Sequence, residues 1–208
     1  MALILIDPVA LHAAAQQHRK VADTVEHVVD MMGDMCGQLN ASWDGGASEQ
    51  AYAELKRMAH QIADIGRAPH VASGFLTSVA DAFEALDAGG GISGAIGVMP
   101  MGLASAVAPI AQIVLGLRGN VLRIDPDGVR VVAARGMEAS EILSQAAAEL
   151  QSSSKQLLSR WEGNSARKFA ESSEDMVRGL FRAADCVEEF SNDLIKAASR
   201  YEELDNSL

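Results

Sequence analysis

The feature that most constrains the fold of this chain is an internal repeat with a spacing of 118 residues. Three landmarks recur at this spacing without a gap. Asp7-Pro8 returns as Asp125-Pro126, Trp43-Asp44-Gly45 returns as Trp161-Glu162-Gly163, and the segment FEALD at 83–87 returns as YEELD at 201–205. A repeat of this kind indicates two copies of one supersecondary unit, and 208 residues are enough to bury a core.

Each copy has the pattern of two long helices joined by a short turn. The aspartate before each proline can cap the first turn of a helix, and proline fits at the first helical position. Apolar residues then follow in steps of three and four, from Leu11 to Leu39 in the first copy and from Val129 to Leu157 in the second. The pattern resumes after each tryptophan. Such heptad spacing is typical of helices packed at shallow angles.

These patterns predict an all-α fold. One hairpin cannot bury its apolar stripe by itself, so we expect the two helix-turn-helix hairpins to pack antiparallel as an intramolecular four-helix bundle. The expected hairpins span 1–87 and 124–208, and a long apolar linker rich in glycine and alanine spans 88–123. Within the first hairpin, Pro69 removes an amide donor from the second helix and predicts a kink or break near 66–69.

The linker has two interpretations. Residues 88–117 contain no charged side chain, and this run is longer than the roughly 20 residues that span a bilayer. The same segment can also serve as a buried crossover, because antiparallel hairpins require the connection to travel the length of the bundle. The crossover accounts for the whole segment and is the favoured interpretation.

Composition and motif spacing exclude several classes of function. Acidic residues outnumber basic residues 28 to 17, which argues against nucleic-acid binding. We find no phosphate-binding loop, no nucleophile motif and no pair of histidines at metal-ligand spacing, so no catalytic, cofactor or metal residue is predicted. Cys36 and Cys186 are expected to be buried thiols that are not joined. The N-terminal segment lacks the basic leader and the apolar core that are typical of a cleavable signal peptide.

The turn motif carries a family resemblance. Trp43 with Gly45, and Trp161 with Gly163, lie at the centre of a predicted helical hairpin and precede small residues. This arrangement resembles the WXG (ESAT-like) family of proteins exported by type VII secretion systems. Members of that family are usually single hairpins that pair as antiparallel dimers, so the resemblance implies two members fused in one chain and a monomer equivalent to a family dimer.

The resemblance also implies a function. It points to a non-enzymatic secreted protein that acts as a substrate, an effector or an escort of another substrate, cytoplasmic before export and then secreted. The implied partners are the type VII secretion machinery and a co-secreted protein. The alternative is a membrane-perturbing protein that inserts residues 88–117.

Secretion signals of the family include a tyrosine followed four positions later by an acidic residue, which Tyr201 and Asp205 match. The first copy has Phe83 in place of the tyrosine. In the antiparallel arrangement the turn at Trp43 should lie with the C-terminal end of the second copy, and Trp161 should lie next to Phe83. Glycine permits the tight turn, and the indole is expected at an exposed end of the seam, as an end plug or a recognition element.

Overall fold

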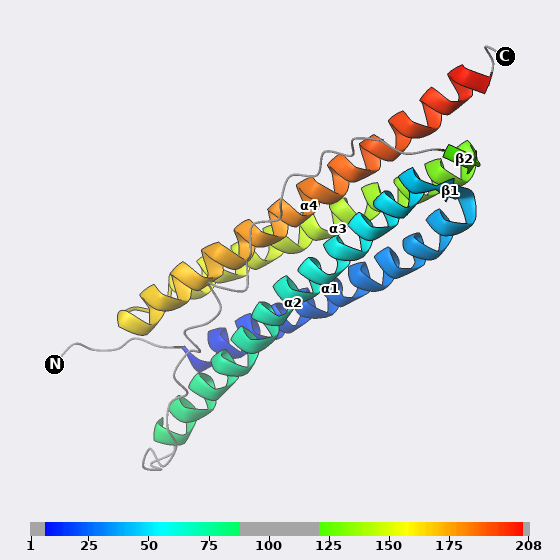
Figure 1. Ribbon diagram of the computed structural model, residues 1–208. Helices are drawn as coiled ribbons and strands as arrows, with labels where there is room; N and C mark the ends of the chain where they lie inside the picture. The colour runs from blue at the N-terminus through cyan, green and yellow to red at the C-terminus, as the bar shows by residue number, and fades with distance from the viewer. Residues whose placement is uncertain (1–6, 88–120, 206–208) are drawn as a thin grey trace. The chain divides into compact units, whose positions relative to one another are not determined.

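The computed structural model of the protein describes residues 7–87 and 121–205. They form four long helices and two short strands (Figure 1). The elements are α1 (Pro8–Ser42), β1 (Trp43–Gly45), α2 (Gly46–Asp87), β2 (Val121–Ile124), α3 (Pro126–Leu158) and α4 (Asn164–Asp205). Residues 88–120 lie outside the described residues. They include all of the proposed membrane insertion, 88–117, and most of the proposed crossover, 88–123.

Both predicted helix starts are confirmed. Asp7 caps α1, because its Oδ1 accepts hydrogen bonds from the amides of Val9 at 3.0 Å and Ala10 at 3.3 Å. Its carbonyl accepts the first helical bond, from the amide of Leu11. In the second copy α3 begins at Pro126, and the carbonyl of Asp125 accepts a bond from the amide of Val129 at 3.0 Å. The two Asp-Pro dipeptides therefore begin their helices with the same backbone hydrogen bond.

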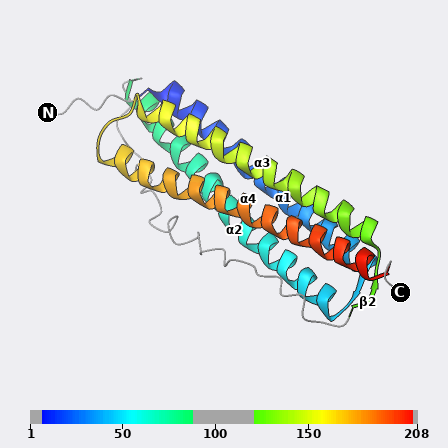
Figure 2. The same cartoon turned by 90° about the horizontal axis from the view of Figure 1, so that it is seen from above.

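The all-α fold of two helical hairpins packed as a four-helix bundle is confirmed. Every helix contributes residues to two compact units. The described part of the first unit contains 7–25, 64–87 and 145–180, and that of the second unit contains 26–63, 121–144 and 181–205. Each unit thus holds the turn of one hairpin together with the open ends of the other, as expected for hairpins that pack antiparallel (Figure 2).

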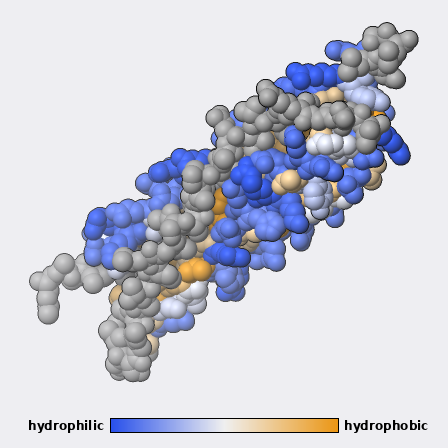
Figure 3. Space-filling view, viewed as in Figure 1, coloured by the Kyte–Doolittle hydropathy of each residue, from blue (hydrophilic) through white to orange (hydrophobic). Residues whose placement is uncertain are grey.

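The predicted apolar positions form the core of both units. In the first unit the buried cluster takes residues from all four helices, namely Leu11, Ala14, Ala15, Leu76, Val79, Ala80, Leu157, Trp161, Ala166 and Phe169. In the second unit Met32, Met35 and Leu39 of α1 are fully buried. Large hydrophobic side chains that remain exposed are few among the described residues, and the face drawn in Figure 3 is mostly hydrophilic.

A two-stranded sheet is the main feature that the sequence patterns missed. The chain at the first turn is extended, and β1 pairs antiparallel with β2 in the register Trp43 with Ile124 and Asp44 with Arg123. The register shifts after Asp44, so that Gly45 pairs with Val121. Strand β2 includes residues that the sequence analysis assigned to the linker. The pairing continues into the helices, because the amide of Asp125 donates to the carbonyl of Ser42 at 2.6 Å.

The expected break at Pro69 is not present. Helix α2 is continuous from Gly46 to Asp87 with Pro69 inside it. Nearby, α2 lies very close to α1, since a Cβ atom added at Gly66 would be 2.8 Å from Cγ1 of Val25. The helix therefore tolerates the missing amide at Pro69, and Gly66 provides the space for the neighbouring helix.

Candidate functional site: the two tryptophan turns and the end of α4

The first turn consists of Trp43–Gly45 and is called the WDG turn. Gly45 has a φ of 119°, which explains why glycine stands there. Behind it, the hydroxyl of Ser48 donates to the carbonyl of Gly45 at 2.7 Å, which closes the start of α2. Trp43 is only 3% exposed, and its indole N–H has no hydrogen-bond partner among the described residues. The WDG turn is thus a buried turn that pairs with strand β2.

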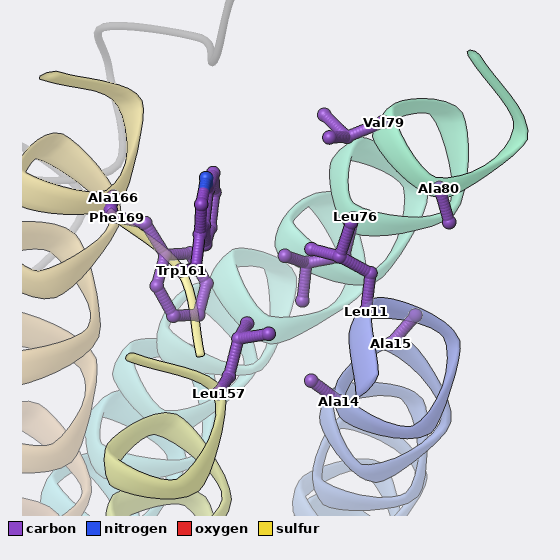
Figure 4. Close-up of a cluster of buried hydrophobic side chains, with 10 residues drawn as sticks. All are labelled: Leu11, Ala14, Ala15, Leu76, Val79, Ala80, Leu157, Trp161, Ala166 and Phe169. Carbon is purple, nitrogen blue, oxygen red and sulfur yellow. The ribbon is translucent and has the colours of Figure 1, made fainter. Parts of the chain in front are cut away.

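The second turn, Trp161–Gly163, is called the WEG turn and lies in the first unit. Gly163 has a φ of 114° and accepts the first helical bond of α4 from Arg167. Trp161 packs against Phe169 with ring centroids 5.5 Å apart, and Figure 4 shows the two rings beside Leu157. Residues 159–163 contain no strand. Residues 3–6, which correspond to β2 in the repeat, lie outside the described residues.

The expectation that the indoles are exposed is wrong. Both tryptophans are 3% exposed, because each indole enters the core at the end of its hairpin. Phe83, which the sequence analysis expected beside Trp161, packs against the buried cluster that contains Trp161. The WEG turn is also tied to the start of α1 by an ion pair between Arg160 and Asp7 at 3.3 Å.

The end of α4 belongs to the same unit as the WDG turn. Tyr201 is half-buried, and it makes no side-chain hydrogen bond within the part of the chain that the structure describes. Its neighbour Glu202 forms a two-point ion pair with Arg130 of α3, with the closer contact at 2.5 Å. These hydrogen bonds lower the pKa of Glu202 and raise the pKa of Arg130. The last turn of α4 is therefore held against α3 beside Tyr201.

The structure brings Trp43, Gly45, Tyr201 and the backbone of Asp205 into one compact unit. It assigns Trp161 and Gly163 to the other unit. The two cysteines are half-buried rather than buried, so that expectation is wrong, but they are free as predicted. Burial raises the pKa of both thiols, which disfavours the nucleophilic thiolate form.

Two surface features of the first unit had no signal in the sequence. An open groove of about 550 Å³ lies between α1 and α3, and at one end Glu149 accepts hydrogen bonds from Gln17 at 2.7 Å and Lys20 at 3.1 Å. These two bonds lower the pKa of Glu149. The second feature is a cluster of His12, Asp81 and Glu84, whose ligand atoms all lie within 4.8 Å of one another. Contacts between helices distant in sequence create both features, so residue spacing could not reveal them.

None of the four described helices has both the length and the hydropathy of a membrane span. Neither the curated proteins nor the solved structures that we searched contain a match to this chain. A family model does match, and it does so twice. The WXG100 model, described as proteins of 100 residues with WXG, matches residues 3–88 and 121–206.

The two matches contain the two tryptophan turns and cover most of the chain. The family implies helical proteins associated with type VII secretion, with dimer-like pairing of hairpins. Here the pairing takes place between two hairpins of one chain. The protein therefore belongs to the WXG100 family, as a tandem member with two copies of the family hairpin.

Proposed function

We propose that this protein is a non-enzymatic substrate of a type VII secretion system that acts as an effector or as an escort of a co-secreted protein. The observation that carries the proposal is the double match to the WXG100 family across both hairpins. The packing supports it, because the apolar positions of the four described helices are buried in the cores of the two units. The partners proposed are the secretion machinery and one co-secreted protein.

We also propose that a single chain replaces the dimer of single-hairpin relatives. In this division 1–87 and 124–208 are the hairpins and 88–123 is the linker. Support comes from the apolar stripes of the two hairpins. In both units these residues are buried in a core to which both hairpins contribute. Light scattering at micromolar concentration should give the mass of one chain, 21.9 kDa. An obligate dimer that separates only on unfolding would contradict the proposal.

The proposed export signal consists of Tyr201 and Asp205 at the end of α4, together with the WDG turn. Residues four apart lie on one face of a helix, so the secretion machinery can contact both from one side. Two observations support this choice. The end of α4 and the WDG turn occupy the same compact unit, and the Tyr201 hydroxyl is not used in a hydrogen bond within the described residues. Because Trp43 is buried, it would position this surface rather than contact the machinery.

The test is export from a strain with a working type VII system. Tyr201→Phe removes only the hydroxyl and keeps the ring contacts, and Asp205→Ala removes the carboxylate. Both variants should accumulate in cells and be depleted from the supernatant, with a melting temperature close to that of the wild type. Asp87→Ala, at the corresponding position of the first copy, is the matched control and should be exported normally. Wild-type export of the Tyr201 and Asp205 variants would show that Tyr201 is a packing residue only.

A further inference from the structure

The cluster of His12, Asp81 and Glu84 joins the start of α1 to the end of α2 in the first unit. Nε2 of His12 lies 3.3 Å from Oε1 of Glu84 and 3.6 Å from Oδ1 of Asp81. The two carboxylates are three positions apart on α2, so one face of that helix presents both to the imidazole. The side chains are partly to largely exposed, with His12 at 35%. Solvent ions can therefore reach all three groups.

These distances match those between ligands of a tetrahedral metal ion. Nitrogen and oxygen ligands lie about 2.0–2.2 Å from Zn²⁺, which places two ligand atoms roughly 3.3–3.6 Å apart at a tetrahedral angle. The two separations that involve His12 already fall in this range. The two carboxylate oxygens lie within 4.8 Å of each other. Rotation of these exposed side chains can shorten that distance to the separation of two metal ligands.

The second copy provides an internal comparison for the same place in the fold. At the 118-residue spacing, His12 corresponds to Arg130, Glu84 to Glu202 and Asp81 to Ser199. In the second copy Arg130 holds Glu202 in a two-point ion pair and also lies 3.3 Å from Asp127, so a permanent cation of the chain faces both carboxylates.

The first copy also has two carboxylates at this place, but an imidazole stands where the second copy has the permanent cation. Among the described residues, the ion pairs of Asp81 and Glu84 are with His12 and with no lysine or arginine. A protonated imidazole could neutralise only one of the two carboxylates. The first copy therefore has the excess negative charge and the three ligands of a cation site, where the second copy has a closed ion pair.

We propose that His12, Asp81 and Glu84 bind a divalent transition-metal cation of the Zn²⁺ class. An imidazole with two carboxylates suits such ions, and solvent would complete the coordination on the exposed side. The bound ion would connect the first turns of α1 to the last turns of α2. It would thereby fasten the open end of the first hairpin, as the Arg130 ion pair fastens that of the second.

The experiment uses the full chain with Cys36→Ser and Cys186→Ser, which remove the two thiols as competing ligands. The protein is treated with a chelator and titrated with ZnCl₂ at pH 7.5 in a calorimeter, and its melting temperature is measured with and without zinc. We expect one zinc per chain and a higher melting temperature with zinc, because the ion binds only the folded arrangement.

The decisive variant is His12→Arg with Asp81→Ser, which gives the first copy the residues of the second. It should fold, with an ion pair in place of the metal site, and bind zinc at least about 10-fold more weakly with no rise in melting temperature. Asp81→Asn keeps the shape of the side chain, and it should weaken binding in the same direction. His60→Gln is the control, since His60 is an exposed histidine bonded to the carbonyl of Lys56, and it should bind like the parent.

Two results would overturn the proposal. One is equal zinc affinity in the parent, the double variant and Asp81→Asn, which would assign binding to other surface groups. The other is no binding by the parent at about 100 µM zinc, which would leave the cluster as an ion pair.

Discussion

The two tryptophan turns have the same motif and the same glycine conformation, but they are held by different contacts. The WDG turn is paired with strand β2 and ends in a backbone hydrogen bond between Asp125 and Ser42. At the WEG turn Trp161 forms an aromatic pair with Phe169, and Arg160, which directly precedes the turn, forms an ion pair with Asp7. The family motif therefore specifies the bend of the backbone, whereas the neighbouring chain decides how the bend is stabilised.

A second difference lies inside the hairpins, at positions 18 and 136 of the shared register. His18 is fully buried in the first unit, with Nδ1 2.8 Å from the carbonyl of Ala14 and the ring tilted against Phe169. Its counterpart Gly136 lies against α4 so closely that an added Cβ would be 2.0 Å from Oγ of Ser191. One copy thus fills this position with a ring, and the other uses it for a close helix contact.

The largest effect is expected at the tryptophans. Trp161→Ala removes a buried indole and its aromatic partner contact, so it should lower the free energy of unfolding by about 3–5 kcal/mol in urea titrations. Trp43→Ala should cost less, because the strand pairing remains and the variant removes a buried N–H that has no partner among the described residues. An equal loss of unfolding free energy in the two variants would mean that pairing with β2 does not stabilise the WDG turn.

A smaller loss is expected from Gly136→Ala. The new methyl group would collide with Ser191, so unfolding should become easier by about 1–3 kcal/mol. Gly74→Ala is the matched control, because no atom of the described residues lies within 4 Å of a Cβ at Gly74. That control should be neutral or should stabilise the helix by up to about 1 kcal/mol. Equal effects of the two substitutions would contradict the close packing of α3 and α4.

The smallest of the three effects concerns pH. Burial lowers the pKa of His18 below its ordinary value of 6.5. At pH values between the folded and the unfolded pKa of His18, this side chain is more protonated in the unfolded chain than in the folded one. The free energy of unfolding should therefore fall as the pH drops below about 6.5. The melting temperature should decrease from pH 7.5 to pH 5.5, and His18→Leu should reduce that decrease. His60→Gln should keep the wild-type profile, and an unchanged profile in His18→Leu would show that His18 does not titrate in this range.

The sequence predicted the repeat, the helix starts and the antiparallel pairing, because capping residues and heptads act through local spacing. It did not predict the pairing of β1 with β2, since β2 follows a linker with no strand pattern and its partner is only three residues long. The burial of Trp43 and Trp161 was missed because a tryptophan at a turn looks exposed when the facing helices are unknown. The His12 cluster was missed for the same reason, since its ligands come from two helices.

The central claim is that the two copies share one fold and that the second copy carries the export signal. The measurement that tests it most directly is the export of a chain in which the hydroxyl is exchanged between equivalent positions, Phe83→Tyr with Tyr201→Phe. This exchange preserves the composition and both aromatic rings. The account predicts a folded protein with a near wild-type melting temperature that remains in the cell. Export at the wild-type level would contradict it.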